Sequence, residues 1–214
     1  QRAKAAPLLA KAITQAMQGL GMQGGRFEVA LEKAAQPTQS GLEDVAFLVA
    51  GHAGSTPRPL GKVASGGELS RLALAIAVTT TQRADEASAV GTLIFDEIDS
   101  GVGGAVADTV GQLMQQLGRE RQVLAVTHLA QVAACAHQHL VVSKALTGGQ
   151  TSSDIRPVES DDRVKEIARM LGGVITDTSR AHAQAMLQSA REHDQVDAGL
   201  VASTTRSRSK KVAA

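Results

Sequence analysis

The fold of this chain is decided by one stretch, Lys62-Val63-Ala64-Ser65-Gly66-Gly67-Glu68-Leu69-Ser70-Arg71. Ser65 is a typical helix N-cap residue, and Glu68 three positions later completes a capping box. Gly66 and Gly67 then fall in the first helical turn, where they leave the free backbone N–H groups open to an anion. Two glycines cost about 1 kcal/mol each inside a helix, so something other than helix stability explains them. An ordinary capped helix after a glycine turn is the alternative for this stretch alone.

Composition narrows the class of protein. The chain has 214 residues, 43% of them hydrophobic, which is enough for one sizeable core. Its net charge is +1 and its aromatic content 1%, so composition indicates neither a basic surface nor base stacking on aromatic side chains. The single cysteine, Cys135, excludes an internal disulfide framework and is typical of a reducing, cytosolic setting. No apolar run is long enough to cross a bilayer, and the start at Gln1 without a secretory signal indicates a piece of a longer chain.

The hydrophobic pattern alternates between strands and helices along the chain. It predicts helices over residues 2–17, 65–80, 105–117, 161–171 and 178–193, and strands over residues 26–31, 45–49, 92–97, 123–128, 139–144 and 153–158. Continuous apolar strands that alternate with helices predict an α/β fold with a largely parallel sheet and flanking helices. Residues 196–214 are polar and are predicted to form a disordered tail.

Polar residues follow two of the predicted strands and are candidates for a phosphate-handling site. In parallel sheets, ligands bind beyond the carboxyl ends of the strands, and Asp96, Glu97 and His128 lie at such ends. Asp96 is suited to hold Mg²⁺, which prefers few carboxylates plus phosphate oxygens. Glu97 is placed to orient or deprotonate a water that attacks a phosphoryl group, and His128 to donate to that group. Taken singly, each is also compatible with a solvated strand end or a hydrogen-bonded loop histidine, but their order after the glycine-opened helix favours the functional interpretation.

Three segments carry a resemblance to a known family: V-A-S-G-G-E-L-S-R-L-A-L-A-I from residue 63, L-I-F-D-E-I-D-S-G-V-G-G from residue 93, and V-T-H-L-A-Q-V-A from residue 126. In this order they resemble an ABC signature, a Walker B strand that runs into a D-loop, and a switch histidine. Together they look closely like the C-terminal part of the RecN family, SMC-like ABC ATPases of bacterial DNA repair. The resemblance runs from about residue 2 to residue 190.

The resemblance implies a domain organisation and a reaction. Residues 1–20 would be the end of a returning coiled-coil helix, and residues 21–195 the C-terminal lobe of an ABC/SMC-type P-loop ATPase head. In such heads ATP and Mg²⁺ are sandwiched between two copies, so the chain would act in a homodimer. The family function is recombinational repair of DNA double-strand breaks, with head engagement driven by ATP binding and release driven by hydrolysis. DNA as a partner, and a cytoplasmic, nucleoid-associated location without a membrane, follow from the family alone.

Site residues are carried over by position. The signature residues would face the nucleotide of the opposite head: Ser65, Gly66, Gly67 and Glu68. Asp96 would serve Mg²⁺ and Glu97 would be the catalytic base. Asp99 would reach across the dimer, and His128 would contact the γ-phosphate of its own head.

One part of the family pattern is missing. No G-x-x-x-x-G-K-[ST] P-loop occurs, since Gly61-Lys62 is followed by Val63 and Thr56 stands where the first glycine is needed. The Q-loop glutamine is also absent. We therefore expect this ATP hydrolase lobe to bind and hydrolyse ATP poorly by itself, and to need the N-terminal half of the same head as a partner.

Other interpretations stay open at this stage. The chain could be the nucleotide-binding subunit of an ABC transporter, although the run Glu68-Leu69-Ser70-Arg71 is more typical of SMC-like heads, or a non-catalytic interaction lobe. The segment Cys135–His139 is a weak candidate for a metal site because a second ligand pair at a usual spacing is missing. The tail could touch DNA phosphates through its basic residues, which are Arg206, Arg208, Lys210 and Lys211.

Overall fold

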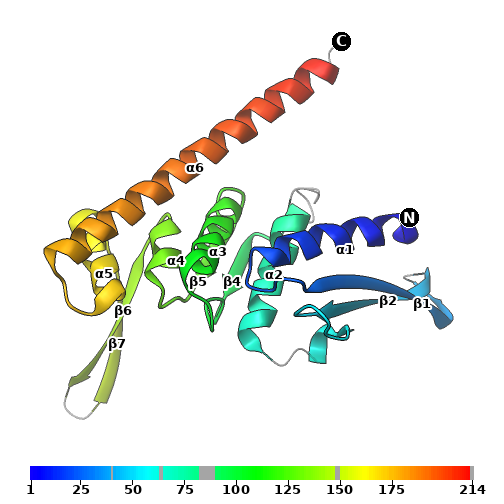
Figure 1. Cartoon of the computed structure of the whole chain (residues 1–214), viewed down its shortest axis with the longest axis horizontal. Coiled ribbons are helices and arrows are strands. Elements are labelled where there is room, and N and C mark those ends of the chain that lie inside the picture. Colours follow the sequence, from blue (N-terminus) through cyan, green and yellow to red (C-terminus); the bar gives the residue numbers. More distant parts are fainter. Residues whose placement is uncertain (40, 63–64, 82–89, 148–149, 213–214) are drawn as a thin grey trace.

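A computed structural model describes residues 1–39, 41–62, 65–81, 90–147 and 150–212. The elements are, in order, α1 Arg2–Gln18, β1 Arg26–Thr38, β2 Gly41–Ala50, β3 Arg58–Pro59, the 3-10 helix η1 Leu60–Lys62, α2 Gly66–Thr81, β4 Thr92–Phe95, α3 Gly104–Leu117, β5 Gln122–Ala125, α4 Ala130–Cys135, β6 Leu140–Thr147, β7 Gln150–Pro157, α5 Ser160–Gly172 and α6 Asp177–Val212. Figure 1 shows a mixed α/β body from which the β6–β7 hairpin and the long helix α6 project.

The sheet is less parallel than the sequence predicts. In the part of the chain that the structure describes, β1, β2 and β3 form an antiparallel sheet, β4 and β5 a parallel pair, and β6 and β7 an antiparallel hairpin. The difference arises from the connections: strands joined by short turns pair as hairpins, whereas β4 and β5 are separated by α3, the crossover that parallel strands need. The α/β class is confirmed, with the parallel part confined to β4–β5.

The predicted elements are otherwise recovered, with two shifts of boundary that matter. β5 ends at Ala125, so His128 lies three residues beyond its strand and not at its last position. At the C-terminus the backbone of α6 is helical through Val212, where the sequence predicted disorder. No proline and only one glycine, Gly199, occur in Asp177–Val212, so nothing in the segment breaks the helix.

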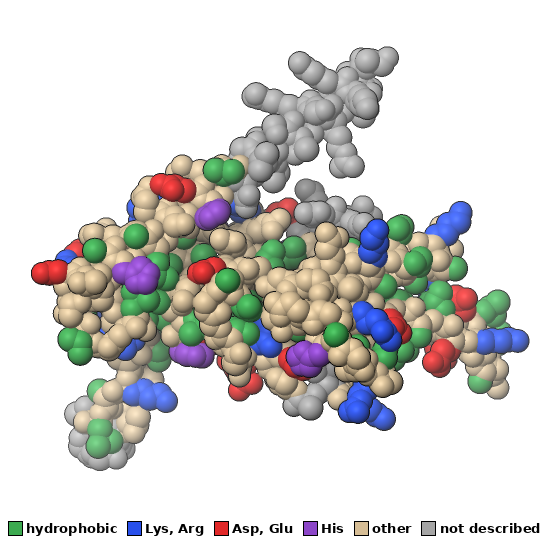
Figure 2. Space-filling model, viewed as in Figure 1, with side chains coloured by type: hydrophobic (Ala, Val, Ile, Leu, Met, Phe, Trp, Pro, Cys, Tyr) green, Lys and Arg blue, Asp and Glu red, His purple; other side chains and the backbone are tan. Residues whose placement is uncertain are grey.

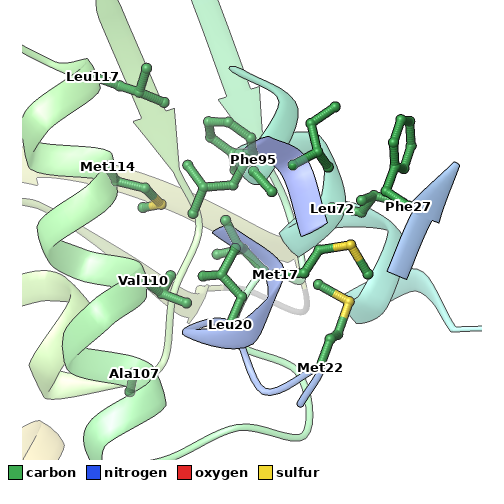
Figure 3. Close-up of a cluster of buried hydrophobic side chains, with 14 of the residues drawn as sticks. Met17, Leu20, Met22, Phe27, Leu72, Phe95, Ala107, Val110, Met114 and Leu117 are labelled. Carbon is green, nitrogen blue, oxygen red and sulfur yellow. The ribbon is translucent and has the colours of Figure 1, made fainter. Parts of the chain in front are cut away.

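One hydrophobic core joins α1 and α2 to β4 and α3 (Figure 3). Met17 near the end of α1 and Leu20 just after it are fully buried in it, together with Leu72 of α2 and Val110 of α3, and Phe95 of β4 is buried beside them. Burying a side chain of this size contributes about 1.5–3 kcal/mol relative to leaving it exposed. The end of α1 is therefore packed into the same core as the strand that leads to the acidic residues.

A second, smaller core lies among α4, α5 and α6. It is built mainly from small residues, which allow the helices to approach closely: Ala130, Ala133, Ala134, Ala168 and Ala183, with Ile167 and Leu187. Arg163 of α5 donates from Nη2 to the carbonyl groups of Ala133, Ala134 and Ala136 at the end of α4. These bonds satisfy carbonyls that a helix end leaves without partners. They fix α4, the helix that directly follows His128.

The contact between α3 and α4 can be tested at Gly111. A Cβ at this position would lie 2.9 Å from Cys135 Sγ and 3.2 Å from the Gln131 carbonyl oxygen. We expect Gly111→Ala to lower the free energy of unfolding by about 1–3 kcal/mol, because the helices must move apart. Gly172→Ala is the matched control, since nothing lies within 4 Å of its Cβ position. Urea denaturation followed by circular dichroism checks both, and equal stability of the two variants would contradict the packing described.

Candidate functional site

The polar residues that follow β4 and β5 are brought to one edge of the parallel pair. Phe95 and Ala125 are register partners, and the Val126 N–H donates to the Phe95 carbonyl at 3.0 Å. Asp96 and Glu97 come directly after β4, and His128 comes shortly after β5. The expected gathering of these three residues at the carboxyl ends of the strands is thus found.

Glu97 has a strained backbone. Its φ is 55°, in the left-handed region that a non-glycine residue rarely adopts. Its N–H is held by Asp96, whose Oδ1 accepts it at 2.9 Å. Strain of this kind costs about 1–3 kcal/mol and persists where the surroundings impose it, often at functional sites. Both carboxylates are exposed and open to a ligand.

The two signature glycines accommodate the approach of this acidic loop. A Cβ on Gly66 would lie 2.7 Å from Glu97 Oε2, and a Cβ on Gly67 would lie 2.9 Å from the Ser100 carbonyl oxygen. Real Cβ atoms do not come this close to other atoms, so a side chain at position 67 would meet fixed backbone, whereas one at position 66 would displace the exposed Glu97 carboxylate. The first turn of α2 and the loop of residues 96–100 therefore form one surface, with the Glu97 carboxylate against the start of the helix.

Ser65 caps this helix start. Its Oγ accepts the Glu68 N–H in a long bond of 3.4 Å, and its carbonyl accepts the Leu69 N–H at 3.1 Å. The Glu68 carboxylate turns toward His52, with Oε1 3.5 Å from Nε2. It does not turn back toward the Ser65 N–H, which it would accept in a complete capping box. The Ser65 half of the predicted box is therefore present, and it holds the helix end in place without a ligand.

Two residues of α2 that the sequence analysis did not single out hold the acidic loop. Ser70 Oγ donates to the Asp96 carbonyl at 2.8 Å, and Arg71 Nη1 donates to the Ser100 carbonyl at 2.9 Å. The sequence spacing could have indicated this role. Ser70 and Arg71 stand four residues after Gly66 and Gly67, and residues four apart lie on the same face of a helix.

The Asp99 side chain is turned into the histidine loop of its own chain, and the expected reach of Asp99 across a dimer stays a prediction. Its side chain is 4% exposed, and its Oδ2 accepts bonds from Thr127 Oγ1 at 2.5 Å and from the His128 N–H at 2.9 Å. The same oxygen lies 3.2 Å from His128 Nδ1. An acidic residue in a turn has the same pattern whether it faces solvent or a neighbouring loop, so sequence alone could not give its direction. Asp99 anchors the histidine loop, and the His128 ring stays 73% exposed.

The donor set fits Mg²⁺ bound jointly with a phosphate ligand better than a caged metal. Mg²⁺ is commonly held by one or two carboxylates plus phosphate oxygens and water, and the exposed Asp96 carboxylate supplies such a group. The described residues contain no group of three or more His, Cys, Asp or Glu that could hold a metal ion, and this includes the Cys135–His139 segment. Within the same residues, no helix combines the length and apolar character needed to cross a membrane.

The fold is that of an SMC-type ATPase head, in its C-terminal part. The solved Smc head domain with a coiled coil and joint from Pyrococcus yayanosii superposes on 78% of this chain and 29% of its own, with a TM-score of 0.53 and 22% identity.

Several curated relatives of this chain carry one name. The chain is 46% identical over 194 residues to the DNA repair protein RecN of Xylella fastidiosa strain 9a5c, covering 89% of this chain and 34% of that protein. It is 42% identical over 188 residues to the RecN of Vibrio cholerae and 43% identical over 186 residues to that of Deinococcus radiodurans, covering 87% of this chain in each case. No protein-family model matches. The resemblance to the C-terminal part of RecN is confirmed, and the chain spans about a third of the length of these relatives.

The buried thiol of Cys135, at the end of α4, can be tested for reactivity. Burial raises the pKa of Cys135 to about 11, with the nearby Asp108 acting in the same direction. Because only the thiolate is nucleophilic, we expect Cys135 to react with iodoacetamide at pH 8 far more slowly than a free thiol, and to reach the free rate once urea unfolds the chain. The raised pKa also means that the folded state keeps a proton that the unfolded chain loses first, so this contribution to stability declines as the pH rises from about 9 toward 11. A native rate equal to the unfolded rate would contradict the burial.

Proposed function

We propose that this chain is the C-terminal half of a RecN-like ATPase head, which acts in the repair of DNA double-strand breaks. ATP binding would join two heads and hydrolysis would separate them. The observation that carries the proposal is the contact between the glycine-opened start of α2 and the acidic loop that ends β4. The relatives named for DNA repair support the biological setting.

The residues divide the reaction between two places on the surface. The start of α2, capped by Ser65, is exposed at Gly66 and buried at Gly67, and the free N–H groups of such a helix end attract a phosphate. This end is assigned to the nucleotide of the opposite head. Glu97 is assigned as the base that orients the attacking water, and His128 as a donor to the transferred phosphoryl group of its own head.

Mg²⁺ and ATP are the cofactors that these residues would serve. Asp96 would hold the ion, directly or through water, and the ion would neutralise charge on the transferring phosphoryl group. The chain's own part is positional: Asp96 fixes the Glu97 backbone, and Asp99 fixes the His128 loop. Glu68 is assigned to the signature but turns toward His52, so its role is to support the helix end and not to touch the nucleotide.

The exposed apolar side chains of the parallel strands support an N-terminal half of the head as the partner of this chain. Strands of a parallel sheet are normally apolar on both faces and covered on both. Here Phe95 is buried and Leu93 and Val123 on its face are half-buried, whereas the register partners Ile94 and Leu124 are 71% and 44% exposed, and Val126 is 65% exposed. An N-terminal half that carries the P-loop would cover these side chains and supply the missing phosphate cradle.

The DNA partner and the cytoplasmic, nucleoid-associated location are supported only by the relatives' names. On the face that Figure 2 shows, Lys and Arg side chains are interspersed with Asp and Glu and form no continuous basic surface. The charge distribution on that face therefore adds no argument for DNA binding. Residues 197–212 include the basic tail, and their side chains lie outside the described part of the structure, so their contact with DNA stays a prediction.

Turnover measurements test the proposal. We expect this chain alone to release no phosphate from ATP, and a mixture with an N-terminal half carrying the P-loop to be active. Glu97→Gln should lower kcat of the mixture by about 10²–10⁴-fold, the contribution typical of a general base. Ser65→Arg should abolish ATP-driven association of heads, because it places a bulky side chain at the helix end that receives the phosphate. Phosphate release and size-exclusion chromatography with light scattering check the two effects.

Matched variants separate these effects from general damage. Glu120→Gln and Ser189→Arg make the same chemical changes at exposed positions away from the site and should leave turnover unchanged. Equal turnover by the isolated chain would show that the nucleotide site is misassigned. A folded but inactive mixture would favour the alternative of a non-catalytic interaction lobe.

A further inference from the structure

Two successive residues of α2 bracket the acidic loop. Ser70 bonds the Asp96 carbonyl at the start of the loop, and Arg71 bonds the Ser100 carbonyl at its end. Glu97 lies between these two anchor points with its strained φ of 55°. The loop conformation that aims Glu97 is thus held at both ends by one helix.

The burial of Arg71 lowers the stability of the fold. The residue is only 6% exposed, and its Nε has no hydrogen-bond partner among the residues that the structure describes. Burial lowers the pKa of its guanidinium, although the nearby Glu68 acts in the opposite direction. A buried cation with an unsatisfied donor costs free energy that an apolar side chain of similar length would not. The stability of the fold alone therefore does not explain why an arginine stands here.

The guanidinium is part of the packing around the signature. A Cβ on Gly67 would lie 3.1 Å from Arg71 Nη1 and 2.9 Å from the Ser100 carbonyl oxygen, so the glycine, the guanidinium and the loop carbonyl are in close contact. One residue earlier, the Cβ position of Gly66 lies 2.7 Å from Glu97 Oε2. A shift of the first turn of α2 cannot leave the acidic loop unchanged.

We propose that Arg71 is a positioning residue that couples the start of α2 to Glu97 through the Ser100 carbonyl. This inference rests on the proposed function, in which the α2 start meets the nucleotide of the opposite head while Glu97 serves its own. Arg71 then links the two nucleotide sites of a head pair within one chain. Docking of a phosphate on Gly66 and Gly67 fixes α2, and Arg71 passes that position on to the loop that aims the base.

Arg71→Met tests the inference in the complex of this chain with its N-terminal half. Methionine fills the buried volume and removes the donor. We expect kcat for ATP to fall roughly tenfold to hundredfold, the loss typical of a base displaced by about 1 Å. KM for ATP should stay within about twofold, because Arg71 touches no nucleotide. The melting temperature should be unchanged or higher, because a buried charge is replaced by an apolar group.

Arg119→Met is the control for the loss of a part-buried arginine. Arg119 bonds Asp194 through Nε and Nη2 at 2.9 and 2.7 Å, at the opposite end of α3 from the acidic loop. Its loss should lower the melting temperature and leave kcat unchanged, the reverse of the pattern expected for Arg71→Met. Arg71→Lys, which keeps a shorter donor, should lie between wild type and Arg71→Met in kcat.

Each outcome of these measurements supports or overturns the role proposed for Arg71. A wild-type kcat in Arg71→Met overturns the inference and leaves the proposed function intact. A fall in kcat that tracks a fall in melting temperature across both Arg71 variants shows a merely structural residue and also overturns it. If Arg71→Met does not fold, a reduced kcat with an unchanged melting temperature in Arg71→Lys supports the coupling, and an unchanged kcat overturns it. A folded wild-type complex without turnover overturns the proposed function and the inference together.

Discussion

The site depends on one close approach, that of the first turn of α2 to the loop after β4. Two glycines without side chains allow it, and the hydrogen bonds of Ser70 and Arg71 hold it. The contact keeps Glu97 in a left-handed conformation that it would leave if the loop were free. Because the same loop carries Asp99, the contact also reaches the histidine loop after β5. Three segments that are distant in the sequence thus share one small set of backbone carbonyls and N–H groups.

This arrangement gives the paired glycines a second role beside an anion-binding one. A helix start that binds phosphate needs N–H groups free of obstruction, and glycine provides this. Here Gly67 is needed already for the approach of the chain's own Ser100 backbone, and Gly66 leaves room for the Glu97 carboxylate, before any ligand is considered. The two demands act on the same atoms, so a substitution at either glycine would disturb the loop as well as the ligand. Effects of such substitutions on nucleotide binding alone would therefore be difficult to isolate.

Sequence patterns predicted the parts of the structure that depend on local order. The apolar run ending at Phe95, followed by two acidic residues, located β4 and its functional end, and Ser65 located the start of α2. Strand pairing could not be predicted in the same way, because a short apolar run has the same pattern in a hairpin and in a parallel sheet. The inward direction of Asp99 and the burial of Arg71 depend on which loops meet in space, and no local pattern records that. The tail was predicted to be disordered because it is polar. Its backbone is instead helical, because the segment lacks residues that break a helix.

The end of α1 has a mechanical consequence. Met17 and Leu20 are seated in the core beside Phe95, the last residue of β4. A helix seated in this way cannot rotate about its axis or slide along it without leaving a void beside that strand, and close-packed interiors resist voids. Torque that reaches the C-terminal half of α1 is therefore delivered to β4 as a displacement. Through this packing, the end of α1 acts as a lever on the strand that presents the acidic residues.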